Sequence, residues 1–137
     1  MIKTEQQIER DFYTLIVNSP LGEAVNKRVY RDGMRPANAT TEDLVIKFLS
    51  GIDEQVQTGV VILNLYVPDV ACSESGIKVK DAARIAVLEE LILSFVNDNA
   101  DTEYWMQTDG TPISMFNEEI KQHLIYSRIR FNRITAD

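Results

Sequence analysis

The side chains best suited to chemistry are one cysteine, one histidine and two nearby acids. Cys72 is flanked by Asp69 and Glu74, whereas the only histidine, His123, lies at the start of a predicted strand. A zinc site usually needs three or four ligands with recurrent spacing, which these residues lack. A nucleophilic site needs a base and an orienting acid, and nothing beside His123 in the sequence supplies them. We expect a structural or surface role for His123, with a small ligand-binding site near Asp69, Glu74 and His123 as the alternative.

Residues 97–103 alternate oxygen-bearing side chains, a pattern that invites comparison with a calcium-binding loop. Counted from Asn97, the sixth position is Thr102, where the EF-hand loop needs glycine. The twelfth position is Thr108, where that loop needs a bidentate glutamate. The segment is therefore predicted to be the end of a helix followed by a polar loop.

Known catalytic motifs are missing from the sequence. The chain has neither of the glycine-rich patterns G-x-x-x-x-G-K-[ST] and G-x-G-x-x-G, whose backbones bind phosphates. It also lacks the G-x-S-x-G turn that presents a nucleophilic serine. Glu89 and Glu90 are adjacent in a predicted helix, so their side chains diverge and cannot act as a paired acid and base. We expect a protein that is not an enzyme and that uses no cofactor or metal.

The composition predicts one globular domain over residues 1–137. Hydrophobic residues make up 45% and charged residues 26% of the chain, an ordinary balance for a folded protein. The net charge of −7 argues against nucleic-acid binding, because phosphates are neutralised by clustered Lys and Arg. No apolar run reaches the roughly 18–20 residues of a membrane helix, and residues 1–11 lack the apolar region of a signal peptide. We expect a cytosolic protein at synthesis, with no membrane partner.

The N-terminal segments predict a helix, a break and a short strand. Residues 4–17 have capping-box spacing at Thr4 and Gln7, and their apolar positions form one stripe. That stripe consists of Ile8, Phe12, Leu15 and Ile16. Residues 18–25 break the pattern and allow a short turn of helix, after which a brief strand is expected around Tyr30.

Two apolar strands in the centre of the chain predict an antiparallel hairpin. Residues 42–51 alternate in polarity and are rich in β-branched side chains, which favours strand over helix. Residues 59–70 form the most apolar stretch, interrupted only by Asn64. We expect Asn64 and Tyr66 on the second, half-exposed face of this strand, and the helix-covered face to carry Val61, Leu63, Leu65 and Val67. The mostly polar segment between the strands, residues 52–58, predicts a long, mobile tip.

The longest helix is predicted at residues 79–99, after a loop over residues 69–78. Its apolar positions fall on two neighbouring lines, so its apolar surface is wider than burial on one side requires. Part of that surface is expected to contact another chain. A short strand at residues 104–106 and a connector at residues 115–122 are expected to follow.

In the closing segment, residues 123–134, apolar and polar side chains alternate as in an antiparallel strand with one solvent-exposed face. Its inner face is predicted to carry Ile125, Ile129 and Phe131, and its outer face Tyr126, Arg128, Arg130 and Asn132. The complete pattern predicts an α+β fold, with a mainly antiparallel sheet of about four to five strands and two principal helices packed on one face.

The order of these elements resembles that of the tail-terminator, or tail-completion, proteins of long-tailed bacteriophages and prophages. The resemblance covers roughly residues 5–134 and is carried by the first helix, "VNKRVYRDGMRP", "EDLVIKFLSG", "GVVILNLYVPD", the long helix and "HLIYSRIRFNRI". The segment "TDGTPISMFNEEI" is longer than the family pattern leads us to expect.

The resemblance implies a structural protein that forms a ring, commonly a hexamer. Such a ring caps the tail tube and offers a docking surface for the head, so the partners implied are copies of itself, the tail tube protein and the head–tail connector. The protein would be made in the bacterial cytoplasm and end in the virion tail. The expected interface residues are Ile52, Asp53, Glu54, Gln55, Val56, Asn64, Tyr66, Arg128 and Arg130, with residues 69–78 as a further contact segment. A bacterial adaptor with one exposed helix face, or a small ligand-binding domain, is the competing hypothesis.

Overall fold

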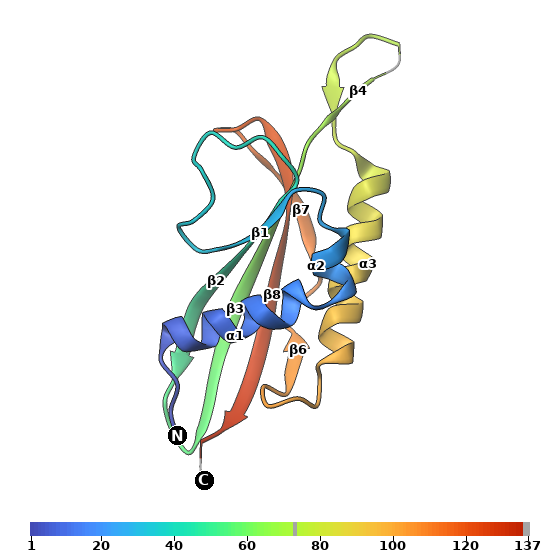
Figure 1. The fold of residues 1–137 in the computed structure, drawn as a ribbon. Helices are drawn as coiled ribbons and strands as arrows, with labels where there is room; N and C mark the ends of the chain where they lie inside the picture. Colours follow the sequence, from blue (N-terminus) through green and yellow to red (C-terminus); the bar gives the residue numbers. More distant parts are fainter. Residues whose placement is uncertain (73, 136–137) are drawn as a thin grey trace.

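A sheet of six strands carries two long helices on one of its faces in the computed structural model of the chain, which describes residues 1–72 and 74–135 (Figure 1). The strands follow the order β1-β2-β3-β8-β6, and β7 pairs with the other half of β8. A separate pair, β4 and β5, lies outside this sheet. The elements are α1 (Glu5–Val17), α2 (Pro20–Ala24), β1 (Arg28–Arg31), β2 (Asp43–Ile52), β3 (Val56–Val67), β4 (Val70–Ala71), β5 (Lys78–Val79), α3 (Ala82–Asp98), β6 (Met106–Thr108), β7 (Ile113–Asn117) and β8 (Gln122–Ile134).

The α+β class, the two principal helices and the antiparallel hairpin are confirmed. β2, β3 and β8 pair antiparallel along most of their lengths, and both β6 and β7 pair antiparallel with β8. β1 pairs with β2 in parallel. The sheet is larger than expected because the 13-residue strand β8 is long enough to pair with both β6 and β7 along the same edge.

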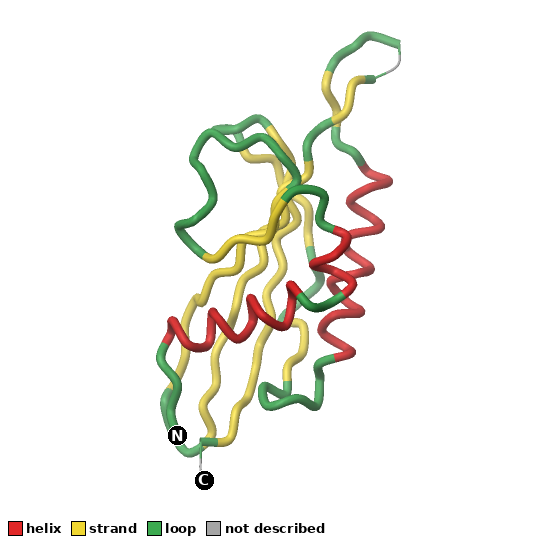
Figure 2. Tube along the Cα trace, in the orientation of Figure 1, coloured by secondary structure: helices red, strands yellow, loops and turns green. Residues whose placement is uncertain are grey.

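The helix α1 forms as its sequence predicts. The hydroxyl of Thr4 accepts a hydrogen bond from the backbone N–H of Gln7, and the Gln7 side chain accepts one from the backbone N–H of Thr4. This reciprocal capping satisfies two backbone donors that a helix start leaves unpaired. Ile8, Phe12 and Ile16 face the sheet and are buried, so α1 lies across the helix-covered face, as Figure 2 shows.

The two faces of the central strand are those that the alternation predicts. Val61, Leu63, Leu65 and Val67 are buried beneath the helices, in one core with Ile125, Ile129 and Phe131 of β8. The opposite side, which we call the open face, carries the half-exposed Asn64 and Tyr66. On the open face Asn64 is paired with Val45 of β2 and with Tyr126 of β8.

One glycine of β3 makes room for an aromatic ring. Gly59 is paired with Phe131 across the β3–β8 ladder, and a Cβ at Gly59 would lie 2.8 Å from two carbons of the Phe131 ring. The ring therefore occupies the space above the glycine and packs against Phe12 and Tyr104, with ring centroids 5.7 and 5.3 Å away. This cluster joins β8 to α1 and to the segment before β6.

The prediction of a long hairpin tip over residues 52–58 is wrong. β2 extends to Ile52 and β3 begins at Val56, so only residues 53–55 lie outside the strands. The buried Gln57 side chain donates hydrogen bonds to Asp53 Oδ1 at 2.9 Å and to the Lys3 carbonyl at 2.8 Å. The backbone N–H of Thr135 donates to the Gln55 carbonyl at 3.0 Å. These bonds tie the tip to both chain ends, and no sequence pattern indicates them.

The strands near residues 104–122 are also placed differently from the prediction. The expected strand at residues 104–106 begins only at Met106, because Trp105 has a positive φ of 39° that breaks the extended backbone. Tyr104 is buried in the aromatic cluster instead. The expected connector at residues 115–122 contains the end of β7. This strand pairs antiparallel with residues 122–126 of β8.

Candidate interaction surfaces

The predicted interface residues fall into two separate groups. Ile52, Asp53, Glu54, Gln55 and Val56 form the hairpin tip, where the Ile52 and Val56 side chains are exposed. Asn64, Tyr66, Arg128 and Arg130 lie on the open face, further along the strands. Residues 58 to 66 of β3 span about 27 Å at about 3.4 Å per residue, so Tyr66 and the tip do not share one patch.

A loop over residues 32–42 covers the Tyr66 end of the open face. The carboxylate of Asp43 is fully buried and accepts hydrogen bonds from Arg35 Nε at 2.9 Å and from Thr41 Oγ1 at 2.8 Å. The Arg35 guanidinium also stacks over the Tyr66 ring, 4.0 Å from its centroid. The Gln122 amide donates to the Thr40 carbonyl at 3.1 Å. This part of the open face is therefore closed by the protein itself.

Arg128 and Arg130 lie in the uncovered part of the open face. Arg128 Nε donates to Asp109 Oδ2 at 3.1 Å, and both side chains are about one-third exposed. The hydrogen bonds with Tyr126 and Asp109 raise the pKa of Arg128, which keeps its positive charge fixed. Arg130 is exposed and forms no salt bridge with the described residues. The two arginines thus present positive charge to solvent or to a partner.

Reversing both of these charges tests whether the open face is an interface. If the open face is a subunit interface, the R128E/R130E variant should lose self-assembly while its free energy of unfolding stays within about 1 kcal/mol of wild type, because isolated surface ion pairs contribute little. Urea denaturation and sizing of the same sample give both results. A stability loss well above 1 kcal/mol would show that the arginines support the monomer fold instead.

Of the three residues in the alternative ligand site, the structure brings two together. His123 Nδ1 and Asp69 Oδ1 lie 2.7 Å apart, and the Phe116 ring packs edge-on against the imidazole at 5.2 Å. Glu74 lies in the turn between β4 and β5, which stands away from the sheet (Figure 1). Within the described residues, no three His, Cys, Asp or Glu side chains converge as ligands for a metal ion. The Asp69–His123 pair joins the end of β3 to the start of β8.

A second buried acid fixes the start of α3. Arg84 donates to both carboxylate oxygens of Glu42, at 3.0 and 2.7 Å, and to the Ala24 carbonyl at 2.6 Å. The Asn26 backbone and side chain donate to the same carboxylate at 3.0 and 3.2 Å. A cavity of about 480 Å³ lies beside this cluster and also borders Asp69. Its acids Glu42, Asp69 and Asp81 are thus already engaged with groups of this chain, Asp81 with the backbone N–H of Arg84.

A charged cluster holds the two chain ends together. Lys3 Nζ lies 2.6 Å from Asp11 Oδ2 and 2.9 Å from Glu103 Oε2. Arg133 Nε donates to Glu103 at 2.5 Å, and the buried Tyr104 hydroxyl donates to Asp11 at 2.5 Å. Burial and then the Asp11 hydrogen bond raise the pKa of Tyr104. The hydroxyl therefore remains a donor to Asp11.

This cluster predicts a loss of stability in acid. Burial alone raises the pKa of Asp11 and of Glu103. Hydrogen bonds from Lys3 and Tyr104 to Asp11, and from Arg133 and Lys3 to Glu103, outweigh burial and lower both pKa values below the ordinary 3.8 and 4.5. A lowered carboxylate pKa stabilises the folded state above the unfolded value, and that contribution is lost as the pH falls through the folded value. We expect stability to drop below about pH 4.5. Urea midpoints from pH 7 to 3 should fall less steeply for E103Q, and equal slopes would contradict the assignment.

The polar loop after α3 is placed as the sequence predicts. The helix ends at Asp98, and the Asn99 side chain donates to the Phe95 carbonyl at 2.8 Å. The Thr102 hydroxyl donates to the Asn99 carbonyl at 3.0 Å. These bonds satisfy helix-end groups, so the oxygen-rich stretch is the C-cap of α3.

The predicted contact segment, residues 69–78, belongs mostly to the projecting pair of strands β4–β5. We call this pair the arm (residues 70–72 and 74–79); residue 73, part of the predicted contact segment, lies outside the described residues. Val70 is paired with Val79, and the Cys72 N–H donates to the Ile77 carbonyl at 2.7 Å. Directly paired residues share a face, so Val70, Cys72, Ile77 and Val79 all lie on one side of the arm. The sequence signal for these strands was the alternation of Ile77 and Val79 with lysines, which sequence analysis took for a loop.

The apolar face of the arm is uncovered. Val70 is 43%, Ile77 66% and Val79 43% exposed. An isolated two-stranded hairpin is marginally stable in water, and Figure 1 shows the arm extending beyond the N-terminal end of α3, away from the sheet. The apolar side of the arm is therefore a surface that another chain would stabilise.

The outer face of α3 also carries exposed apolar side chains. Ile85, Leu88, Ile92 and Phe95 are buried in the core. On the solvent side, however, Val87 and Leu93 are 51% and 46% exposed and flank Glu90. Three small residues, Ala82, Ala83 and Ala86, are exposed on the same side and allow close approach of a partner. The wide apolar surface predicted for this helix is confirmed.

A groove lies at the opposite edge of the sheet, beside β1. It has a volume of about 520 Å³, and we call it the β1 groove. Its lining consists of Tyr13, Arg28, Val29, Tyr30, Arg31, Met34 and Pro36. Of the described strands, β1 pairs only with β2, so its outer edge faces the groove unpaired.

Comparison with known proteins adds no relative: no protein-family model matches the chain, and no curated protein matches it significantly. No helix in the described parts of the chain has the length and apolar character needed to span a membrane.

Proposed function

We propose that this protein is a structural subunit of a phage or prophage tail that assembles with copies of itself into a ring. The ring caps the tail tube and joins it to the head. The observation that carries the proposal is the exposed apolar side chains on one face of the arm and on the outer face of α3. Exposed apolar surface of this kind marks sites of protein–protein contact. The order of elements that resembles the tail-terminator proteins supplies the identity of the assembly.

The use of the polar side chains supports a structural role. Asp69 is engaged with His123, Glu42 with Arg84, and Asp43 with Arg35. Each pair connects separate segments of the chain, so these acids fix the relative positions of the loop, the arm base and α3. Such rigidity suits a subunit whose contact surfaces must keep one geometry through a closed ring.

The overall charge also suits the proposed role. The formal net charge of −7 disfavours adsorption of DNA, which has to pass through the ring without sticking. We place the protein in the bacterial cytoplasm at synthesis and in the tail of the assembled virion. Its other partners are the tail tube protein and the head–tail connector, and a six-membered ring is the expected stoichiometry.

Mass measurement over a range of concentration tests the proposal. Light scattering on a sizing column from about 1 μM to about 100 μM should show monomer giving way to one defined oligomer, the behaviour of subunits with micromolar contacts. The neighbouring genes should encode a tail tube and a tape-measure protein. A strict monomer that binds a metal ion or metabolite at the cavity near Asp69 would overturn the proposal and favour the ligand-binding alternative. A one-to-one complex with an unrelated protein would favour the adaptor.

A further inference from the structure

The β1 groove and the arm are complementary in their apolar surfaces and, among the described residues, in their unpaired strand edges. The groove presents an apolar lining and the free edge of a strand, whereas the arm presents a short two-stranded ribbon with one apolar face. We infer that the arm of one copy lies in the β1 groove of a second copy, where it extends that copy's sheet. This inference rests on the proposed function and names the contact that would build the ring.

Strand addition explains why the groove would accept an extended segment. The unpaired edge of a sheet offers backbone N–H and C=O groups to an incoming strand. Affinity then comes from main-chain hydrogen bonds, and specificity comes from pockets that receive alternate side chains. Ile77 and Val79 are alternate residues on the apolar face of the arm. They are the side chains that would enter the apolar part of the groove, between Tyr13 and Met34.

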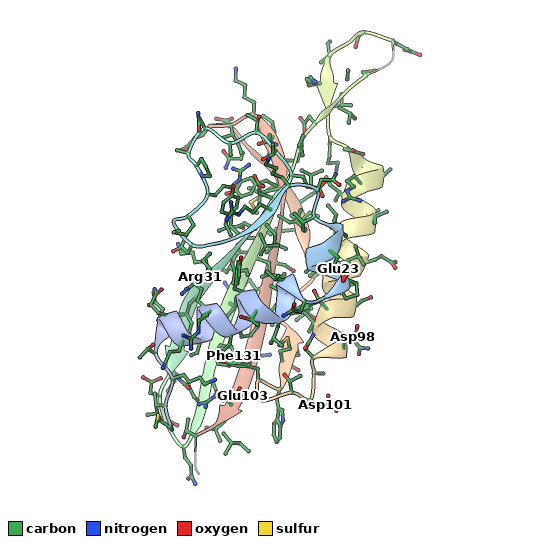
Figure 3. The ribbon with its side chains drawn as sticks, viewed as in Figure 1. Glu23, Arg31, Asp98, Asp101, Glu103 and Phe131 are labelled. Carbon is green, nitrogen blue, oxygen red and sulfur yellow. The ribbon has the colours of Figure 1, made fainter. Side chains whose placement is uncertain are left out.

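Charge complementarity identifies the second copy as the occupant. On the flank of the molecule that carries the arm, the solvent side of α3 bears the exposed acids Glu90, at mid-helix, and Asp98, at the helix end far from the arm. In the lining of the groove, Arg28 is exposed and forms no salt bridge with the described residues. Figure 3 shows Arg31 at the β1 edge, and Asp98 at the opposite flank with α3. Copies placed side by side would set an acidic flank against a basic one, which favours this orientation over its reverse.

The positions of the two surfaces predict the type of assembly. The arm extends beyond α3 on one flank of the sheet, whereas the groove lies beside α1 and β1 on the other (Figure 1). A contact between two different surfaces is heterologous, so each bound copy leaves one arm and one groove free for the next. Repetition of this contact closes into a ring when the rotation between copies allows it.

The single native cysteine provides a direct test. Cys72 lies on the apolar face of the arm, and Met34, which lines the groove, is 68% exposed. Hydrogen bonds involving the Glu74 backbone and the Ser75 side chain lower the pKa of the Cys72 thiol, which favours the reactive thiolate. In the M34C variant, mild oxidation with diamide should link Cys72 of one copy to the introduced thiol at position 34 of another, with diamide taking up the two electrons and two protons. Non-reducing gels should show a ladder of covalent oligomers, and peptide mapping should identify the bond between positions 72 and 34.

Matched controls separate this contact from random collision. N38C places a cysteine at another exposed site of the same loop, outside the groove lining, and should give at least tenfold less covalent oligomer. C72S/M34C should give no ladder. A bond between two copies of Cys72 as the main product would overturn the inference, because it would show arms packing on arms. An assembled oligomer without the bond between positions 72 and 34 would overturn the inference and leave the ring proposal standing, whereas a protein that stays monomeric would overturn both.

Discussion

The double variant V87K/L93K is expected to lose self-association almost completely. Both side chains are exposed on the outer face of α3. Lysine at these positions places two positive charges against a contact that excludes water, and also against the basic flank of the next copy. We expect the protein concentration at half-association to rise at least tenfold, which corresponds to a loss of about 1.4 kcal/mol for each contact between subunits. Light scattering over the concentration range used for wild type measures the shift.

The fold of this variant should be unchanged. Lysine has a higher helix propensity than valine, and exposed substitutions usually change stability by no more than about 0.5 kcal/mol. The control E118Q/E119Q changes the net charge by the same two units at exposed positions of the β7–β8 turn. It should assemble like wild type. Normal assembly of V87K/L93K would contradict the assignment of α3 as a contact surface.

The variant F131A is expected to lose about 3–5 kcal/mol of unfolding free energy, the usual cost of removing a buried aromatic ring. Phe131 is fully buried, contacts the rings of Phe12 and Tyr104, and fills the space above Gly59. The truncation leaves a cavity that β3 cannot close, because neighbouring strands hold it on both sides. Since a domain of this size has only about 5–15 kcal/mol of stability, the loss should be evident in a urea midpoint.

A surface aromatic provides the comparison. Phe116 is 50% exposed on β7, and its ring packs edge-on against His123. We expect F116A to cost at most about 1 kcal/mol, in keeping with partial burial. Similar losses for the two variants would show that the cluster around Phe131 is not the centre of the core.

Alternation and helical periodicity predicted the part of the fold that the core dictates. The buried face of β3 and the inward residues of β8 follow from strict period-two patterns, and the start of α1 follows from the capping box at Thr4. The errors of the prediction lie where contacts between segments distant in the sequence determine the structure. The hairpin tip is fixed by hydrogen bonds from Gln57 to the Lys3 carbonyl and from Thr135 to the Glu54 carbonyl, whose partners are far apart in the sequence. The strand β7 exists because β8 has an unpaired edge beside it.

The candidate surfaces were predicted less completely. The width of the apolar face of α3 was visible in the sequence, whereas the arm was taken for a loop because its strands are only two residues long. Arg35, which is paired with the buried Asp43, stacks over Tyr66. No local sequence pattern predicts that this loop folds back on the open face.

Electron microscopy of the concentrated protein tests the central claim most directly. Negatively stained particles should be annular, with one subunit number and a central opening, because a rigid subunit with two different contact surfaces closes into a single kind of ring. A field of two-fold dimers, or of monomers at every concentration, would contradict the account.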